Sequence, residues 1–382
     1  MIDLPLAQIT EGCALFGGIE PVLGVSAVSR FALTGTRTPA SSNLPPITVL
    51  KPLAGLEPRL EEALTSFCAQ TYPEFQIVFG VQDPTDLAIA VVERLQLSFP
   101  ARVIDLVIDR RNYGPNRKVD NLLNMIKLAR HDLLVISDSD IHAPADLLHG
   151  LAATLAKPGV GLATCLYSGL PASASIAARL GATQISHVFL PGAILARKLG
   201  RQDCLGAVMA LYRRDLEAIG GLQALLPFLA DDAMLGQKIV SLGKRVELAP
   251  TVVATTVPES DLAHLWRHEL RWARTIRALA PTAFAASLLQ YPLFFAILAV
   301  VISGASAWSV GLFLALWLFR AVAAAALDYR LGLKPFDNFA LLPLRDLLSA
   351  ALVPAAFLGD KVHWRGELLS VSSNRMSHEG LT

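Results

Sequence analysis

Residues 132–140 read Asp132-Leu-Leu-Val-Ile-Ser-Asp138-Ser-Asp140, an apolar stretch followed by two carboxylates. An uninterrupted apolar run of this length is typical of a strand that is covered on both faces of a sheet. Carboxylates at positions i and i+2 after such a strand can share a hard divalent cation, and that cation can bind a diphosphate. Aspartates also cap turns at strand ends, so the motif by itself leaves a metal site and a structural turn both open.

Strand and helix patterns alternate on the N-terminal side of this segment, after a Pro/Ser/Thr-rich linker at 34–46. This alternation predicts an α/β domain over residues 47–259, with a mostly parallel sheet and helices on both faces. Such sheets bind ligands beyond the carboxyl ends of their strands, where Asp83 and Asp138 both lie. The predicted strands are 47–50, 76–81, 102–108 and 132–137, and the predicted helices are 57–70, 87–97 and 118–129.

A second acidic pair, Asp231-Asp232, stands before a predicted helix at 233–242. Acidic residues are favourable in the first turn of a helix, which gives a purely structural alternative. The functional interpretation is a general base, because transfer of a sugar to an alcohol needs one carboxylate to accept the hydroxyl proton. Lys118 starts a predicted helix near the strand ends. Its ammonium group either binds a diphosphate or is solvated at the start of the helix, and the sequence leaves both interpretations open.

Residues 260–280 predict an amphipathic helix with His264, His268, Arg271 and Arg274 on one side. Such a helix suits a membrane surface, with long cationic side chains and an interfacial tryptophan. For Arg271 and Trp272 we favour a role in a site, where the guanidinium binds phosphate oxygens and the indole forms a wall. His264 and His268 lack a third ligand in the pattern, which disfavours zinc.

The segment from residue 283 to 319 contains no charged or histidine side chain. It predicts membrane segments at about 283–303 and 307–327, each near the roughly 20 residues that a bilayer crossing requires. A third apolar segment, 339–358 within the overall membrane region 283–358, contains Arg345, Asp346 and Pro354. The segment 339–358 could either span the membrane or enter and leave it on the same side. Residues 359–382 are expected to form a C-terminal tail.

The N-terminal residues 1–33 are apolar but carry Glu11 and Glu20, so they predict a membrane anchor that either spans the bilayer or lies at its surface. The content of 53% hydrophobic and 17% charged residues exceeds what a soluble enzyme needs for its core. A formal net charge of +1 gives no reason to expect nucleic acid as a partner. The four cysteines form no Cys-x-x-Cys pair, which argues against a disulfide framework.

Several motifs stand in the order of one known family. They are Val49-Leu-Lys-Pro-Leu-x-Gly55, Gln70-x-Tyr-Pro73, Val81-Gln-Asp83, Asn116-x-Lys118 with Asn121, Asp138-Ser139, Asp231-Asp232 and Arg271-Trp272. This series resembles the inverting glycosyltransferases of family 2 and, more closely, family 21, the ceramide glucosyltransferases and their bacterial hopanoid-pathway relatives. The resemblance covers nearly the whole chain from Ile47 and implies a GT-A-type fold with C-terminal transmembrane helices.

The resemblance also implies roles for single residues. Asp83 would contact the uridine of a UDP-sugar, Asp138 and Asp140 would hold Mg²⁺ or Mn²⁺ with the diphosphate, and Asp232 would be the base. Arg271 and Trp272 would close over the diphosphate, and the nucleotide-sugar site would also include Lys51, Lys118, Asp231 and His268. The sequence departs from the family at two positions, because eukaryotic ceramide enzymes have glycine where Asp140 stands and the Arg-Trp motif begins with His268 instead of glutamine or arginine.

The function expected from the resemblance is inverting transfer of a sugar from a UDP-sugar to a hydroxyl of a membrane lipid. The alanine-rich chain and its small membrane region favour transfer of N-acetylglucosamine to a polyol hopanoid, and transfer of glucose to ceramide is the alternative. A polyprenyl-phosphate glycosyltransferase would also combine Asp-x-Asp with a membrane anchor, but its acceptor is a phosphate. The arginine-rich helix before the first membrane segment predicts that the catalytic domain lies in the cytoplasm. Together with the resemblance to the bacterial hopanoid-pathway enzymes, this predicts an integral protein of a bacterial inner membrane.

Overall fold

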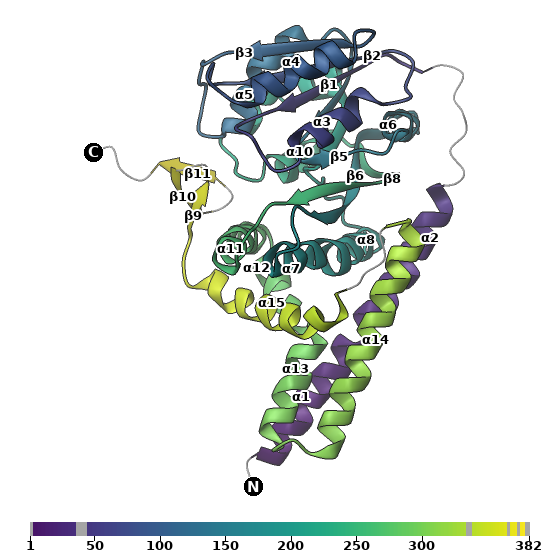
Figure 1. Ribbon diagram of the computed structural model, residues 1–382, viewed down its shortest axis with the longest axis vertical. Coiled ribbons are helices and arrows are strands. Elements are labelled where there is room, and N and C mark those ends of the chain that lie inside the picture. The colour runs from purple at the N-terminus through teal and green to yellow at the C-terminus, as the bar shows by residue number, and fades with distance from the viewer. Residues whose placement is uncertain (1–2, 36–43, 334–337, 365–366, 373–374, 379–382) are drawn as a thin grey trace. The chain divides into compact units, whose positions relative to one another are not determined.

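The structure, a computed structural model, describes residues 3–35, 44–333, 338–364, 367–372 and 375–378 (Figure 1). The chain divides into two compact units, which are described separately. The first, called here the sheet unit, comprises Thr34–Ala172, Leu199–Pro258 and Arg375–Thr382. The second, called the helical unit, comprises Met1–Leu33, Ser173–Lys198 and Glu259–Asn374. The continuous domain expected at 47–259 is therefore interrupted, because Ser173–Lys198 packs with the membrane helices.

In the described part of the sheet unit, eight strands form one sheet in the order β3-β2-β1-β4-β7-β6-β8-β5. The strands β3, β2, β1 and β4 are mutually parallel, whereas β7 runs antiparallel to both β4 and β6. The prediction of a mostly parallel sheet thus holds for its first half, and the complete sheet is mixed. The strands are β1 (Ile47–Pro52), β2 (Phe75–Val81), β3 (Val103–Ile108), β4 (Leu133–Ser137), β5 (Ile141–His142), β6 (Val160–Pro171), β7 (Val208–Tyr212) and β8 (Arg245–Val257).

Helices cover both faces of this sheet, as the alternation of strands and helices predicts. Alternate residues of β1 enter different cores: Ile47 and Val49 pack in one cluster, and Leu50 packs in the other. Full burial of such an aliphatic side chain stabilises the fold by about 1.5–3 kcal/mol. The first cluster is closed by α3 (Leu60–Cys68), α4 (Ala88–Ser98) and α6 (Leu147–Leu155), and the second by α5 (Arg117–Met125), α9 (Arg213–Ala218) and α10 (Asp231–Ser241).

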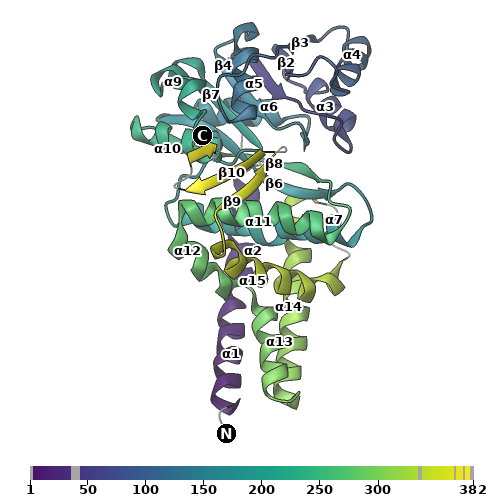
Figure 2. The same ribbon diagram turned by 90° about the vertical axis from the view of Figure 1, so that its left-hand side faces the viewer.

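The helical unit contains the helices that are long and apolar enough to cross a membrane. Among the described residues three candidate spans meet this test, namely Pro5–Phe31, Ala307–Leu331 and Phe339–Phe357, and a bent pair of helices makes a fourth candidate if the two are counted as one span. In both views α1, α13 and α14 run side by side (Figures 1 and 2). The helices are α1 (Asp3–Gly17), α2 (Ile19–Gly35), α7 (Ile176–Gln184), α8 (Leu190–Lys198), α11 (Leu262–Leu279), α12 (Pro281–Ala286), α13 (Pro292–Ile302), α14 (Ala307–Leu331) and α15 (Leu342–Phe357).

The segment predicted as one span at 283–303 is broken. Its two parts, Pro281–Gln290 and Pro292–Ile302, meet at an angle of 61°. Pro292 explains the break, because proline restricts the residue before it and cannot donate a backbone hydrogen bond. The carboxylate of Asp346 on α15 accepts a hydrogen bond of 3.0 Å from the N–H of Leu293, so the start of α13 is capped by a distant side chain.

The third predicted segment, 339–358, forms α15, which runs crosswise to α13 and α14 in both views (Figures 1 and 2). Its two charged residues, Arg345 and Asp346, are both 0% exposed. The predicted tail contains the strands β9 (Lys361–Trp364), β10 (Glu367–Ser372) and β11 (Arg375–His378), of which β9 and β10 pair antiparallel. Most of the predicted linker, residues 36–43, lies outside the described residues.

Candidate active site

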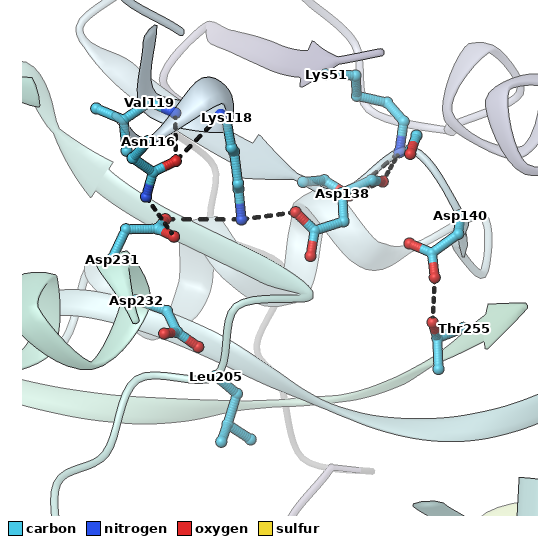
Figure 3. A network of polar contacts seen from close by, with 12 residues as sticks. Lys51, Asn116, Lys118, Val119, Asp138, Asp140, Leu205, Asp231, Asp232 and Thr255 are labelled. Atoms are coloured by element: carbon cyan, nitrogen blue, oxygen red, sulfur yellow. Dashed lines mark hydrogen bonds and ion pairs between the residues drawn. The ribbon is translucent and has the colours of Figure 1, made fainter. Parts of the chain in front are cut away.

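The side chain of Lys118 joins the two acidic motifs of the sheet unit. Its Nζ lies 2.6 Å from Oδ1 of Asp138, just after β4, and 3.7 Å from Oδ2 of Asp231, at the start of α10 (Figure 3). Burial on its own lowers the pKa of Lys118, but the negative charges of Asp138 and Asp231 outweigh burial and hold this pKa above its ordinary value. Lys118 therefore keeps its charge and brings together carboxylates that are far apart in the sequence.

Asn116 fixes the position of Lys118. It is the N-cap of α5, and its Oδ1 accepts hydrogen bonds from the backbone N–H groups of Lys118 at 3.0 Å and Val119 at 3.1 Å. Its Nδ2 donates to the carbonyl of Phe228 at 2.8 Å and to Oδ1 of Asp231 at 3.4 Å. The motif Asn116-x-Lys118 thus has a local cause, since one side chain caps the helix and also holds the segment that leads into α10.

Asp232 stands beside Asp231 in the first turn of α10. Its Oδ1 accepts a hydrogen bond of 2.8 Å from the N–H of Ala233. Burial, reinforced by the charge of Asp231, raises the pKa of Asp232 to about 6. The backbone of Gly206 approaches the same carboxylate, because a Cβ at this position would lie 2.8 Å from Oδ2 of Asp232. A carboxylate with this pKa is mostly ionised at neutral pH and basic enough to accept a proton, as a general base must be.

Asp140 lies in the turn after β4 and is held by the hydroxyl of Thr255 on β8, which donates to its Oδ2 (Figure 3). Burial, reinforced by the charge of Asp138, raises the pKa of Asp140 to about 7. The hydroxyl of Ser139 donates to Oε2 of Glu57 at 2.6 Å, which adds a further carboxylate beside this turn. The sequence analysis missed Glu57, which is distant in sequence from Ser139 and lies in no motif that we recognised.

Acidic side chains outnumber basic ones in this group, called here the carboxylate cluster. Its members are the carboxylates of Asp138, Asp140, Asp231, Asp232 and Glu57 and the ammonium groups of Lys51 and Lys118. A divalent cation would relieve the surplus of negative charge, and Asp138 and Asp140 offer the oxygen ligands that Mg²⁺ and Mn²⁺ prefer. Within the described residues no three His, Cys, Asp or Glu side chains converge as a set of metal ligands.

Lys51 was predicted to bind the nucleotide sugar, but its side chain is fully buried, with 0% exposed. Its Nζ donates to the carbonyl of Asp138 at 2.6 Å and to Oγ of Ser137 at 3.2 Å, and it lies 3.7 Å from the ring centroid of Phe67. Burial lowers the pKa of Lys51 to about 7, although Asp140 and Asp138 act in the opposite direction. Lys51 therefore stabilises the turn that carries Asp138 and Asp140. This geometry does not favour a direct contact between Lys51 and a nucleotide sugar.

Asp83 is exposed two residues beyond the end of β2. Its Oδ1 accepts hydrogen bonds from the N–H of Thr85 at 2.9 Å and from the hydroxyl of Thr85 at 2.8 Å. These two hydrogen bonds lower the pKa of Asp83, so its carboxylate is ionised at neutral pH. The structure therefore places Asp83 at the strand end, as predicted, in a turn that leaves the side chain accessible.

The Arg-Trp motif lies on α11 in the helical unit. Nδ1 of His268 is bound to Oε1 of Glu259, and the rings of His268 and Trp272 meet edge to face with centroids 4.4 Å apart. The side chain of Glu259 is only 6% exposed. Burial by itself raises the pKa of Glu259, but the bond to His268 outweighs it and the net shift is downward. Glu259 was missed by the sequence analysis, and it gives a physical role to the unusual histidine at the first position of the motif.

A buried ion pair fastens the same helix to α15. Nη1 and Nη2 of Arg345 each lie 2.7 Å from an oxygen of Glu269, the residue after His268. Arg345 also donates to the carbonyl of Leu180 on α7 at 3.3 Å and to the hydroxyl of Ser349 at 3.0 Å. The bidentate geometry holds α11 in one orientation on its neighbours.

The sequence profile described as "Glycosyl transferase family 21" matches residues 19–377. The chain therefore belongs to glycosyl transferase family 21, as its motifs predicted. Family membership and the mixed α/β sheet together confirm the predicted GT-A-type fold accompanied by helices of membrane-spanning length.

The chain is similar to curated ceramide glucosyltransferases. It is 31% identical to that of Candida albicans over 114 residues, which cover 27% of this chain and 21% of the relative. It is 29% identical to that of Komagataella phaffii over 191 residues, covering 44% and 37%, and 23% identical to ceramide glucosyltransferase 1 of Caenorhabditis elegans over 252 residues, covering 65% and 53%. The matched parts thus span between about a fifth and about a half of these relatives.

Two solved structures are similar over most of the chain. The mannosyltransferase PcManGT from Pyrobaculum calidifontis, in complex with GDP-Man and Mn²⁺, has a TM-score of 0.49 and 20% identity, covering 91% of this chain and 99% of that one. TarS from S. aureus, in complex with UDP-GlcNAc, has a TM-score of 0.41 and 13% identity, covering 88% and 100%.

Proposed function

We propose that this protein transfers a sugar from a UDP-sugar to a hydroxyl group of a membrane lipid, with inversion at the anomeric carbon. Membership of family 21 and the similarity to ceramide glucosyltransferases support this function. The observation that carries the proposal is the position of Lys118 between Asp138 and Asp231, which joins both acidic motifs beside Asp232. The cluster lies beyond the strand ends, where α/β sheets bind their ligands.

In the proposed reaction Asp232 is the general base. Its carboxylate accepts the proton of the lipid hydroxyl while the hydroxyl oxygen forms a bond to the anomeric carbon of the sugar. The bond from that carbon to the terminal phosphate oxygen of the donor breaks at the same time, so UDP leaves with the electron pair. Lys118 keeps its positive charge between Asp138 and Asp231, where its ammonium group can stabilise the departing diphosphate.

Asp138 and Asp140 would hold a divalent cation, Mg²⁺ or Mn²⁺. Such a cation supplies charge neutralisation for the diphosphate. Lys51 binds the backbone between the two aspartates and so keeps their turn in place. The raised pKa of Asp140 means that this residue must lose a proton near neutral pH to act as a ligand.

The remaining predicted residues are assigned to donor binding. Asp83 would contact the uridine, Arg271 would bind phosphate oxygens and Trp272 would form a wall of the donor site. Glu259 binds Nδ1 of His268, so that only Nε2 of this ring is available to another group. His268 would then take the place of the glutamine or arginine that relatives carry at this position.

Two acceptor and donor pairs follow from the resemblance. The curated relatives support ceramide with UDP-glucose as the first pair. The second pair is a polyol hopanoid with UDP-N-acetylglucosamine. Its support is the alanine-rich sequence of the chain, which made it the expected pair in the sequence analysis. We further propose an integral membrane protein with the carboxylate cluster on the cytoplasmic side, where the UDP-sugar pool lies. A cysteine introduced next to Gly304, between α13 and α14, should then react with a label applied outside intact cells.

The function is tested with the purified full-length protein in phospholipid vesicles that contain ceramide, a polyol hopanoid or a polyprenyl phosphate. Each vesicle is supplied with UDP-glucose or UDP-N-acetylglucosamine and Mn²⁺, and the extracted lipids are examined by mass spectrometry. We expect a hexosyl or N-acetylhexosaminyl lipid in one combination, and none with Asp232→Asn. Release of UDP without any new glycolipid, or transfer only to a polyprenyl phosphate, would refute the proposed acceptor class.

A further inference from the structure

A small pocket lies among the membrane helices of the helical unit, at residues that the proposed reaction does not use. Its walls come from α2, from the segment Ile185–Lys198 and from α14, and the space that they enclose is about large enough for one water-sized group. The polar lining consists of Glu20, His187 and Arg320, and Ala323, Ala324 and Leu327 contribute apolar walls. Glu20 and Arg320 belong to candidate membrane spans, where ionisable residues are rare and usually functional.

Two carboxylate oxygens around this pocket lack a hydrogen-bond partner among the described residues. They are Oε1 of Glu20 and Oδ2 of Asp328. Asp328 is only 3% exposed, and its other oxygen lies 2.9 Å from Nε2 of His187, a lining residue. Buried acceptors without a donor are uncommon in native proteins, because neither water nor lipid chains can satisfy them inside a bilayer. Of these two oxygens only Oε1 of Glu20 belongs to a lining residue, so the pocket presents one acceptor that a donor from outside the chain could satisfy.

The arginine of the pocket is bound to α15. Nη1 of Arg320 is bound to Oδ1 of Asp346, and Oδ2 of Asp346 accepts the hydrogen bond from the N–H of Leu293. This arrangement holds the break between α12 and α13. The positive charge of Arg320 acts on both Asp346 and Glu20, but Oε1 of Glu20 has no hydrogen-bond donor among the described residues.

We propose that this pocket binds a hydroxyl group in the polar head of a membrane lipid. Such groups donate hydrogen bonds, carry no charge and fit beside alanine side chains. A phosphate is disfavoured by the carboxylate of Glu20, and a choline group has no N–H or O–H to donate. The group belongs either to the lipid acceptor, in which case the inference rests on the proposed function, or to a lipid that binds here without reacting.

The test compares two probes on the full-length protein in detergent. One probe is N-octanoyl sphingosine, and the other is the same compound with both hydroxyls methylated; binding is measured by native mass spectrometry. We expect the wild type to prefer the free hydroxyls and Glu20→Gln to weaken this binding about 10-fold, because a neutral amide replaces the charged acceptor. The matched control is Glu11→Gln, because Glu11 lies on the same span and already accepts a hydrogen bond of 3.0 Å from Ser309.

A second variant, Ala323→Leu, fills the pocket and leaves every charged residue in place, so it serves if Glu20→Gln folds poorly. Equal binding of the two probes by the wild type, or undiminished binding by both variants, would overturn the proposal and leave a pocket for water. A rise in the KM for the lipid acceptor together with weaker probe binding identifies the acceptor as the ligand, whereas an unchanged KM identifies a lipid that does not react. Binding needs no turnover, so a protein that binds the probe but transfers no sugar refutes only the proposed function.

Discussion

The sheet unit and the helical unit each bury a group of charged side chains, but only one of the two groups is balanced. The carboxylate cluster sets five carboxylates against two lysines. In the helical unit the balanced group consists of two ion pairs, Arg345 with Glu269 and Arg320 with Asp346, and the pocket residue Glu20 stands outside it. Charges that cancel within the chain hold helices in place, whereas surplus charge of one sign destabilises a fold unless a ligand offsets it. The imbalance therefore distinguishes the site from the scaffold.

The largest expected effect is the loss of activity on removal of the cation that would offset the surplus charge. Excess EDTA should abolish formation of the glycolipid, because the leaving diphosphate then lacks a counter-charge. Adding Mg²⁺ or Mn²⁺ back should restore it in the same vesicle assay. Full activity in EDTA would show that the surplus carboxylates serve another purpose.

The next largest effect concerns the base. Asp232→Asn should lower kcat by about 10²–10⁴-fold, the usual contribution of general-base catalysis, while binding of the UDP-sugar persists. Asp231→Asn is the matched neighbour and should lower kcat less, since its carboxylate is bound to Lys118 and Asn116. Equal losses in the two variants would mean that the wrong carboxylate has been assigned.

In the balanced group, substitution should reduce stability. Arg345→Met leaves the carboxylate of Glu269 buried and unpaired, and should lower the free energy of unfolding by about 3–5 kcal/mol in denaturant titrations. The double variant Arg345→Met with Glu269→Leu should recover most of that loss. As a control, Arg94→Met breaks an exposed pair with Glu61, whose side chains are 52% and 51% accessible, and should cost at most about 1 kcal/mol. A loss of the same size in both single variants would contradict the account.

The smallest effect is a gain of stability at Asp140. Because the folded pKa of Asp140 is raised from 3.8 to about 7, the metal-free protein loses stability as pH rises from about 4 to 7. Asp140→Asn removes this ionisation, so it should increase the free energy of unfolding at pH 7.5 by roughly 1–3 kcal/mol and flatten the pH dependence below pH 7. If Asp140→Asn has the same pH profile of stability as the wild type, the pKa of Asp140 is not raised in the folded protein.

Much of the sheet unit is predictable because local patterns determine it. The apolar run that predicts a strand at 132–137 forms β4 at Leu133–Ser137, and the strand ends carry Asp83 and Asp138 as expected. The cap at Asn116 explains why Lys118 reaches the cluster. The burial of Lys51 was not predictable from its motif, because the groups that bind it lie 86 and 87 residues further along the chain.

The helical unit is less predictable because its polar contacts are distant in sequence. Arg345 and Asp346 indicate only that a charge interrupts an apolar segment, whereas their partners Glu269 and Leu293 are 76 and 53 residues away. The break in the predicted span 283–303 could be anticipated from Pro292 in the sequence. Nothing in the sequence indicates that Asp346 caps the helix that starts there. Hydrophobic runs identify membrane segments, and they carry no information on which of them pair.

The central claim is that the unbalanced cluster binds the donor and the balanced one does not. Thermal unfolding in detergent with and without UDP and Mn²⁺ tests this most directly, because a ligand at about 100 times its Kd stabilises the fold by about 2.7 kcal/mol. We predict a clear rise in Tm for the wild type, no rise for Asp138→Asn, and the full rise for Arg320→Met, which breaks the ion pair with Asp346 and should start from a lower Tm. A full rise in Asp138→Asn, or its absence in Arg320→Met, would contradict the claim.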